Sequence, residues 1–305
     1  MAGDRKNDTA IAAEKALCRV GALGSMSTSA ARTLSAELLA GIFHLLSVDC
    51  GYMEWIRVLE VCRRWRTVGL GVSALWTDIH VAKNLPFVNF CLKNSGDMLV
   101  NIFSEEDDAV SDLAGVINSI SAIGLRIRSL RWESSDLETL VQSLDFDMPR
   151  LTQLALGAES GRRPDKKFFW NPRSDQYPSL CSLSLAAVDI QWSYPPFSSL
   201  VNLRLARLTR PDTVDEFLDF LQISPALETL HVDYSAPSVV ENLQIMDWVG
   251  EEPDIPPPTR TLSLLKLRRL HLGDTTFNVK WLLSHMSIPT GTTLSFTYPL
   301  EVGVD

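Results

Sequence analysis

Cysteines, histidines and long apolar runs are all scarce in this 305-residue sequence. The five cysteines, Cys18, Cys50, Cys62, Cys91 and Cys181, are scattered and form no C-x-x-C pair. A zinc site or a disulfide framework is therefore not expected, and a reducing compartment, cytoplasmic or nuclear, is the default location. No stretch approaches the roughly 18 apolar residues that cross a bilayer, so no membrane partner is expected.

Positively charged residues are also fewer than negatively charged ones. Lys and Arg number 28 against 37 Asp and Glu, which gives a net charge of −9. Binding to nucleic acid needs clustered Lys and Arg, so no nucleic-acid partner is expected. Catalytic signatures are missing as well, because the sequence has no H-E-x-x-H, no G-x-S-x-G and no Gly-rich phosphate loop. We therefore expect a protein that is not an enzyme and that holds no metal and no cofactor.

The composition otherwise fits a globular chain, with 46% hydrophobic and 21% charged residues. Residues 1–32 differ, because they are rich in Ala, Ser, Thr and Gly and poor in aromatics. Such a segment buries little apolar surface, and we expect it to be a disordered N-terminal tail.

Residues 34–80 show helical periodicity. Ser35 is a predicted N-cap, and Asp49-Cys50-Gly51 interrupts the pattern before a second helical stretch that ends at Gly69 and Gly71. The apolar residues at helical spacing after Ser35 are Leu38, Leu39, Ile42, Phe43, Leu45 and Leu46. Three short helices make only a small core, so this unit is expected to pack on the rest of the chain or on a partner.

From about residue 98 the sequence changes to short strand-like units with the spacing L-x-x-L-x-L. The units are Leu151-x-x-Leu154-x-Leu156, Leu180-x-x-Leu183-x-Leu185, Leu200-x-x-Leu203-x-Leu205, Leu227-x-x-Leu230-x-Val232 and Leu267-x-x-Leu270-x-Leu272, with Ile127-x-x-Leu130-x-Trp132 as a looser copy. Alternate residues of a strand point to one side, so stacked units would form a parallel sheet with one continuous core. Val100 with Ile102, and Leu294 with Phe296, are candidate end strands.

Helical candidates lie between the strand-like units, at residues 109–120, 135–144, 214–221 and 279–285. Strand then helix, repeated, is typical of a leucine-rich-repeat solenoid. The leading residues are 20 to 40 residues apart, and the longest interval, 227 to 267, has room for a hidden unit. An ordinary α/β domain with Leu-rich strands is the alternative.

Three sequence pieces in the helical segment resemble the F-box family in order and spacing. Leu34-Ser35-Ala36-Glu37-Leu38-Leu39 with Ile42-Phe43 resembles L-P-x-E-[LI]-[LI]-x-x-I-F, Val61-Cys62-Arg63-Arg64-Trp65 resembles V-C-[RK]-x-W, and Ser73-Ala74-Leu75-Trp76 resembles P-x-L-W. The resemblance covers about a sixth of the chain and is nearest to proteins in which an F-box precedes degenerate leucine-rich repeats. Ser35 replaces the usual Pro, and Ser can cap a helix where Pro can begin one.

The resemblance implies a substrate-receptor subunit of a Skp-cullin-F-box ubiquitin ligase. Its F-box would dock on a Skp-type adaptor, and through it on a cullin, while the repeats would bind an unknown target protein. The residues that the resemblance assigns to adaptor contact are Leu34, Glu37, Leu38, Ile42, Phe43, Leu59, Val61, Cys62, Trp65, Leu75 and Trp76. Interfaces of this obligate kind bury on the order of 2,000 Å² and are apolar. For Val61 and Trp65, a place in the core and a place in the interface are equally open.

A basic loop is the candidate for target binding. Arg162, Arg163, Lys166, Lys167 and Arg173 flank the aromatic run Phe168-Phe169-Trp170. Such a loop can stack on bases or grip an acidic peptide. Alternatively, its aromatics can turn back to cover the repeats, which is the favoured interpretation because large aromatics are costly to leave in water.

The expected fold is thus of the α+β or α/β class, with three parts. They are a tail at 1–32, a small three-helix F-box at 33–82, and an irregular strand-helix solenoid of leucine-rich-repeat type at 98–300. A repeat scaffold without ligase activity is the second hypothesis, and an unrecognised enzyme in the C-terminal domain is the third.

Overall fold

A computed structural model describes residues 34–49, 55–81, 85–104, 112–134, 137–157, 169–173, 175–193, 197–238 and 257–298. The chain divides into two compact units, Met1–His80 with Pro86–Val100 and Val81–Leu85 with Asn101–Asp305, which are described separately. Over these residues the fold is mixed α/β, with eight α-helices and a large parallel sheet. None of the described helices is both long and apolar enough to cross a membrane. The tail predicted at 1–32 lies outside the described residues.

The first unit is helical, as the periodicity predicts. Its elements are α3 (Ala36–Asp49), η1 (Trp55–Arg57), α4 (Val58–Val61), α5 (Arg63–Gly71), η2 (Ser73–Trp76), the short strand β1 (Asp78–His80) and α6 (Leu85–Asn94). Ser35 caps α3, because its Oγ accepts a hydrogen bond of 3.3 Å from the Leu38 N–H. The Glu37 backbone N–H and the Ser35 hydroxyl hydrogen-bond the Glu37 carboxylate, and together they lower its pKa below the ordinary value.

Aromatic side chains hold the first unit together. Trp76 is 1% exposed and lies between Trp55 and Phe90, with ring centroids 5.0 Å and 5.1 Å away. The indole N–H of Trp76 donates a hydrogen bond of 3.0 Å to the backbone carbonyl of Gly69. A buried indole N–H without a partner is costly, so this bond fixes how η2 follows α5.

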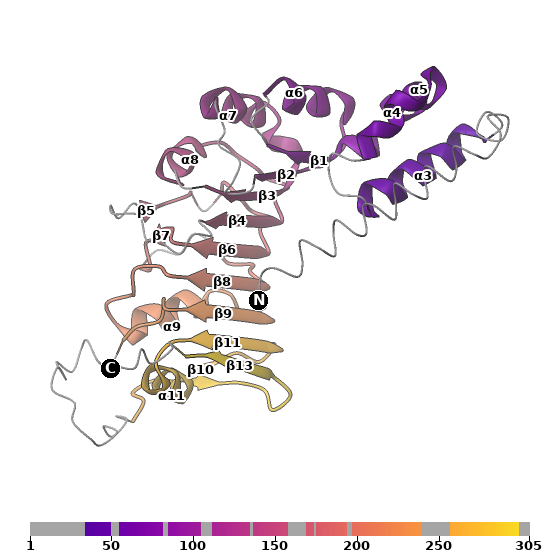
Figure 1. The fold of residues 1–305 in the computed structure, drawn as a ribbon. Coiled ribbons are helices and arrows are strands. Elements are labelled where there is room, and N and C mark those ends of the chain that lie inside the picture. Colours follow the sequence, from indigo (N-terminus) through magenta and orange to yellow (C-terminus); the bar gives the residue numbers. More distant parts are fainter. Residues whose placement is uncertain are drawn as a thin grey trace, which may run out of the picture. The chain divides into compact units, whose positions relative to one another are not determined.

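The second unit contains the parallel sheet, whose strands lie one below the next in Figure 1. From β2 onward the order in the sheet is β2-β3-β4-β6-β8-β9-β11-β13. The strands are β2 (Val100–Ser104), β3 (Ile127–Glu133), β4 (Gln153–Gly157), β6 (Ser182–Ala186), β8 (Asn202–Ala206), β9 (Thr229–Asp233), β11 (Arg269–Gly273) and β13 (Thr293–Thr297). All six L-x-x-L-x-L units contain one of these strands, and both candidate end strands are present.

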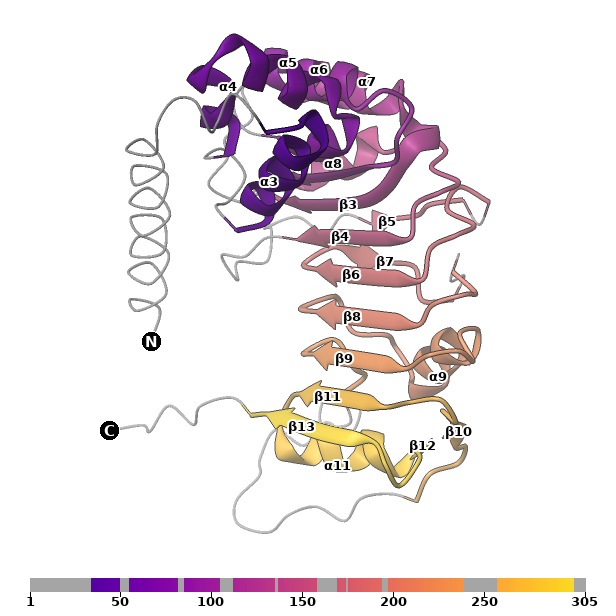
Figure 2. The same ribbon diagram turned by 90° about the vertical axis from the view of Figure 1, so that its right-hand side faces the viewer.

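The register of the sheet stacks equivalent residues of the repeated motif. Leu154, Leu183, Leu203, Leu230 and Leu270 are cross-strand partners in turn, and all are buried. The leading residue of each motif is buried as well, with Leu151, Leu180 and Leu227 no more than 1% exposed. Successive residues of a strand point to opposite faces of the sheet. The residue that follows each of these stacked leucines therefore lies on the opposite face, which is open. Figure 2 shows the strands from β4 to β13 side by side.

The same backbone conformation follows three of the strands. Ala187, Arg207 and Tyr234 come directly after β6, β8 and β9, and their φ angles are 60°, 60° and 50°. Each N–H donates to the carbonyl of the last residue of the next strand, at 2.9, 2.8 and 2.7 Å. The left-handed region costs non-glycine residues energy, so the repeated hydrogen bond is what holds these turns.

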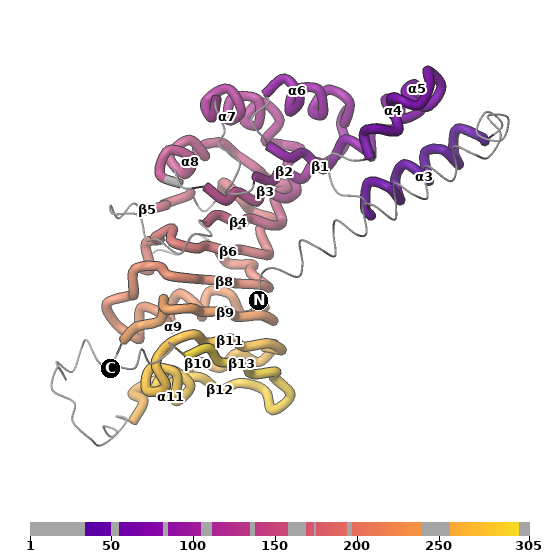
Figure 3. The backbone as a smooth tube through the Cα atoms, in the orientation of Figure 1, coloured from indigo at the N-terminus to yellow at the C-terminus, as the bar shows by residue number. Residues whose placement is uncertain are grey.

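Helices connect several of the strands, and Figure 3 follows the path of the chain through them. They are α7 (Leu113–Ser121), α8 (Leu137–Ser143), α9 (Val214–Gln222) and α11 (Thr276–Ser284), and they match the four predicted helical segments. Asp112, Thr213 and Thr275 cap three of them through their side-chain oxygens. Helix α6 does not correspond to any helical segment predicted from the sequence.

The long interval from 227 to 267 contributes no further strand to the main sheet in its described part. Strands β9 and β11 pair directly with one another. The short strand β10 (Leu262–Ser263) pairs instead with β12 (Met286–Ser287) in a separate two-stranded sheet, and β5 (Phe169–Trp170) pairs with β7 (Asp189–Ile190) in another. The hidden repeat unit is thus not found among residues 234–238 and 257–266.

Candidate functional site

Helix α3 carries an apolar stripe that remains exposed. Leu38, Ile42 and Leu45 are 59%, 38% and 64% exposed, and their spacing of four and three residues places them on one face of the helix. Leu39 and Phe43, one position further along, are fully buried. Large aliphatic side chains in such a row are unusual on a surface that only meets water, so the stripe is a candidate docking surface.

Four of the residues assigned to adaptor contact are buried. Phe43 is 0% exposed, Leu59 8%, Leu75 6% and Trp76 1%. Their side chains have little surface to offer a partner, and their main contribution is to the packing of the chain. The sequence could not separate these residues from the exposed ones, because both kinds are large and apolar.

The other assigned residues keep accessible surface. Val61 is 56% exposed, Cys62 and Glu37 are exposed, and Leu34 and Trp65 are partly exposed. Val61 and Trp65, for which a core and an interface position were both open, differ in their exposure. Val61 is on the surface, whereas Trp65 combines accessible surface with packing against the Phe43 ring.

The predicted basic loop lies mostly outside the described residues, which do not include Arg162, Arg163, Lys166, Lys167 and Phe168. Phe169 is 58% exposed, whereas Trp170 is 4% exposed and packs near Tyr177 and Phe197 at centroid distances of 6.1 and 5.7 Å. Trp170 therefore turns back into the chain, whereas Phe169 does not, and Phe168 lies outside the described residues.

Arg173, at the end of this loop, already has acidic neighbours. Its guanidinium lies 2.5 Å from Asp147 and 3.6 Å from both Asp145 and Asp175. The hydrogen bond and the charge of Asp147 raise its pKa further above the ordinary value. A target with negative charge would have to compete with these three carboxylates for Arg173.

The open face of the sheet is polar. One row across it, in register from β3 to β13, consists of Arg131, Ala155, Ser184, Arg204, His231, His271 and Ser295. A hollow of about 550 Å³ lies at the β2–β4 end of this face and is lined by Arg128, Arg131, Thr152 and Gln153 among others. These side chains are available for contact with another molecule.

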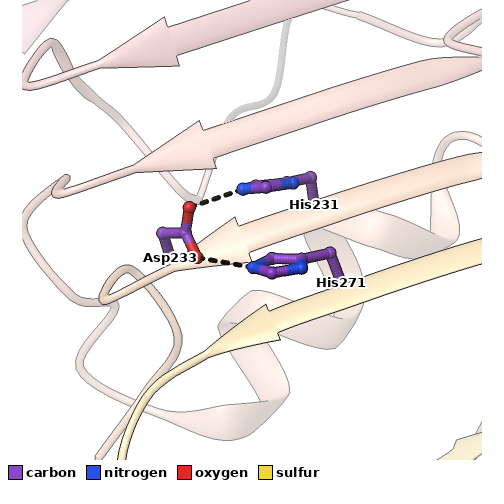
Figure 4. Close-up of side chains that lie close together, drawn as sticks. All are labelled: His231, Asp233 and His271. Carbon is purple, nitrogen blue, oxygen red and sulfur yellow. Dashed lines mark hydrogen bonds and ion pairs between the residues drawn. The ribbon is translucent and has the colours of Figure 1, made fainter. Parts of the chain in front are cut away.

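Three side chains on this face form a cluster that the sequence analysis missed (Figure 4). The carboxylate of Asp233 lies 2.5 Å from Nε2 of His231 and 3.1 Å from Nε2 of His271. The imidazole rings stack with centroids 4.0 Å apart. Burial raises the pKa of Asp233, but hydrogen bonds and charge from the two histidines lower it more, so the pKa falls below its ordinary value.

A signal for this cluster was present in the sequence. His231 and His271 hold the same place in their motifs, each between the last two apolar residues. A parallel register that aligns the motifs brings the two rings together. The two histidines are 40 residues apart along the chain, so only the register across the strands, and no local metal-binding motif, places them side by side.

Comparisons with models of protein families, with curated proteins and with solved structures found no match.

Proposed function

We propose that this chain is a substrate-receptor subunit of a Skp-cullin-F-box ubiquitin ligase. In this proposal, residues 34–80 form an F-box that docks on a Skp-type adaptor. The strands and helices that follow form a leucine-rich-repeat solenoid that binds a target protein. The proposal begins from the three sequence pieces that resemble the F-box family.

The exposed stripe of α3 is the observation that carries the proposal. Leu38 and Ile42 belong to the piece that resembles the start of an F-box, and both side chains are left in solvent while Leu39 and Phe43 form the core. Aliphatic side chains held on a packed helix suit the centre of an apolar interface. Leu45, which the resemblance does not assign, extends the same stripe.

The parallel sheet supports the second half of the proposal. Its equivalent leucines are stacked in register, and three consecutive strands end in the same left-handed turn, as expected for repeats of one structural unit. The polar open face offers a continuous row of side chains, with Arg131 and Arg204 both exposed. We assign target binding to this face.

Co-expression with a Skp-type adaptor tests the proposal. The full chain is expected to co-purify with the adaptor, and the double variant Leu38→Ala with Ile42→Ala is expected to lose the complex. If each side chain contributes about 1.4 kcal/mol to the interface, a factor of about ten, the double change should weaken binding by roughly a hundredfold. Because both side chains are exposed, the variant should remain folded, which circular dichroism can establish.

The control is Leu265→Ala, which removes a leucine of the second unit that is 79% exposed and thus more exposed than Leu38 and Ile42. This variant should co-purify as well as the wild type. Failure of the wild-type chain to bind the adaptor would favour the alternative, a repeat scaffold without ligase activity. Binding that survives the double change would contradict the role of the α3 stripe.

A further inference from the structure

His231, Asp233 and His271 place three potential metal ligands on the open face of the sheet. One ligand atom from each residue lies within 4.8 Å of the other two. The carboxylate of Asp233 contacts both imidazoles, with Oδ2 near Nε2 of His231 and Oδ1 near Nε2 of His271. Two imidazole nitrogens and a carboxylate oxygen are a donor set that Zn²⁺ accepts in proteins.

The backbone fixes the positions of these side chains. His231 and His271 are register partners in the neighbouring strands β9 and β11, so their rings project from the same face at the same level. Asp233 lies two residues after His231 and points to the same face. Its partner in β11 is Gly273, and a Cβ at that position would meet Asp233 Oδ1 at 2.0 Å. The glycine leaves the space through which the carboxylate reaches His271.

A neighbouring hydroxyl orients one of the two rings. Nδ1 of His271 lies 2.8 Å from Oγ of Ser295, its register partner in β13. A metal-ligating histidine commonly donates its second ring N–H to such a group, which leaves the lone pair of the other nitrogen for the metal. When the Nδ1–H of His271 donates to Ser295, the lone pair of Nε2 lies near the Asp233 carboxylate and the Thr297 hydroxyl, at 3.1 and 3.3 Å, where it is accessible to a cation.

The potential ligand atoms lie within 4.8 Å of one another, and each histidine faces a different oxygen of the Asp233 carboxylate. Around a tetrahedral zinc ion with bonds of about 2.0–2.1 Å, the donor atoms are separated by roughly 3.3 Å. The two distances from Asp233 to the histidines are 2.5 and 3.1 Å. An ion would have to lengthen these contacts to about 3.3 Å, which requires rotation of the carboxylate and the rings.

We propose that His231, Asp233 and His271 bind one divalent transition metal ion of the Zn²⁺ class. The three protein ligands leave one position of a tetrahedral ion open to solvent. Water fills it in the free protein, and a donor side chain of a bound molecule can replace the water. The three residues belong to the sheet of the second unit, so the proposed metal site is independent of whether α3 docks on an adaptor.

Metal titration of the full chain, produced without a polyhistidine tag, tests the proposal. Zn²⁺ followed by calorimetry should bind with a stoichiometry of one. Co²⁺, which unlike Zn²⁺ absorbs visible light, should give the d–d bands of a nitrogen- and oxygen-ligated tetrahedral ion. The variants His231→Gln and His271→Gln should each lose these bands. Ser295→Ala should bind roughly tenfold more weakly, because it removes the group that orients His271.

Two control variants address other donors. His44 and Cys62 are exposed and lie in the first unit, so His44→Gln and Cys62→Ser should bind metal as the wild type does. Loss of binding in either control, or unchanged binding in both cluster variants, would overturn the proposal. Absence of a one-to-one complex with the wild type would overturn it as well, and would leave the cluster as a hydrogen-bonded network.

A measurement on the wild-type chain avoids any variant that fails to fold. Diethyl pyrocarbonate modifies accessible imidazoles, and peptide mass spectrometry identifies the modified residues. Added Zn²⁺ should protect His231 and His271 at least fivefold and leave the modification of His44 unchanged. Equal modification of His231 and His271 with and without Zn²⁺ would contradict the site.

Discussion

The rings of Phe43 and Trp65 pack against one another in a tilted arrangement between α3 and α5, with centroids 5.4 Å apart and planes inclined by 57°. Phe43 is completely buried in this contact, whereas Trp65 keeps part of its surface accessible. Phe43 thus belongs to the core of the first unit, whereas Trp65 contacts that core and also has surface that a partner could contact.

Trp65→Ala and Leu38→Ala are therefore expected to differ in stability. Trp65→Ala removes an aromatic contact with the core and should lower the free energy of unfolding by roughly 2 kcal/mol or more. Leu38→Ala changes an exposed side chain and should remain within about 0.5 kcal/mol of the wild type. Urea unfolding of both variants measures the difference. An equal loss in both would mean that Leu38 belongs to the core.

Ser35 is expected to stabilise α3 although it departs from the family pattern. Ser35→Ala removes the N-cap and should cost about 1 kcal/mol of stability. Ser47→Ala is the control, because Ser47 Oγ only donates to the carbonyl of His44 near the other end of α3, and the change should cost less. Thermal unfolding compares the two variants. A larger effect at Ser47 would be inconsistent with the capping role.

The same cap makes a prediction for the titration of Glu37. Its pKa is lowered in the folded chain, so the stabilising contribution of the carboxylate is present above the ordinary glutamate range and is lost as the pH falls through the folded pKa. Ser35→Ala should raise the Glu37 pKa towards its ordinary value, and NMR titration of the carboxyl carbon measures the shift. An unchanged pKa would mean that the Ser35 hydroxyl does not contact the carboxylate.

The left-handed turns after the strands predict that glycine substitutions at two neighbouring positions differ in their effect on stability. Ala187→Gly relieves backbone strain of about 1 kcal/mol and loses a methyl burial of about 0.8 kcal/mol, so stability should change little. Ala186→Gly lies in the extended strand β6 and should cost about 1 kcal/mol through backbone entropy. Denaturant unfolding compares the two, and a larger loss at Ala187 would contradict the turn.

Arg173 is expected to contribute little to stability despite its three acidic neighbours. Its side chain is 55% exposed, and exposed ion pairs contribute at most about 1 kcal/mol. Arg173→Ala should therefore leave the free energy of unfolding nearly unchanged, whereas Trp170→Ala should lower it by roughly 3 kcal/mol. Thermal unfolding of both variants measures the contrast, and an equal loss would be evidence against the surface position of Arg173.

The strands could be predicted from the sequence because the repeated leucines encode both the strand and its register. Once Leu230 and Leu270 are aligned, His231 and His271 follow, and the cluster with Asp233 becomes visible. The passage of the Asp233 carboxylate over Gly273 depends on side-chain packing and could not be inferred from the motif. Helix α6 was not predicted, although Pro86 in its first turn is compatible with the start of a helix.

Which apolar residues of α3 are buried and which are exposed could not be predicted, for a different reason. Both stripes of the helix are apolar, so periodicity indicates a helix without showing which stripe is buried. Leu39 and Phe43 are selected for the core by the elements that pack against them, while Leu38 and Ile42 remain outside. That choice depends on tertiary packing, which no local pattern encodes.

The affinity of the full chain for a purified Skp-type adaptor tests the central claim most directly. We predict a one-to-one complex with a dissociation constant of about 1 μM or below, which corresponds to at least about 8 kcal/mol of binding free energy. Affinity should fall by roughly a hundredfold with Leu38→Ala plus Ile42→Ala and remain unchanged with Leu265→Ala. No measurable binding by the folded wild-type chain, or equal affinity of all three proteins, would contradict the account.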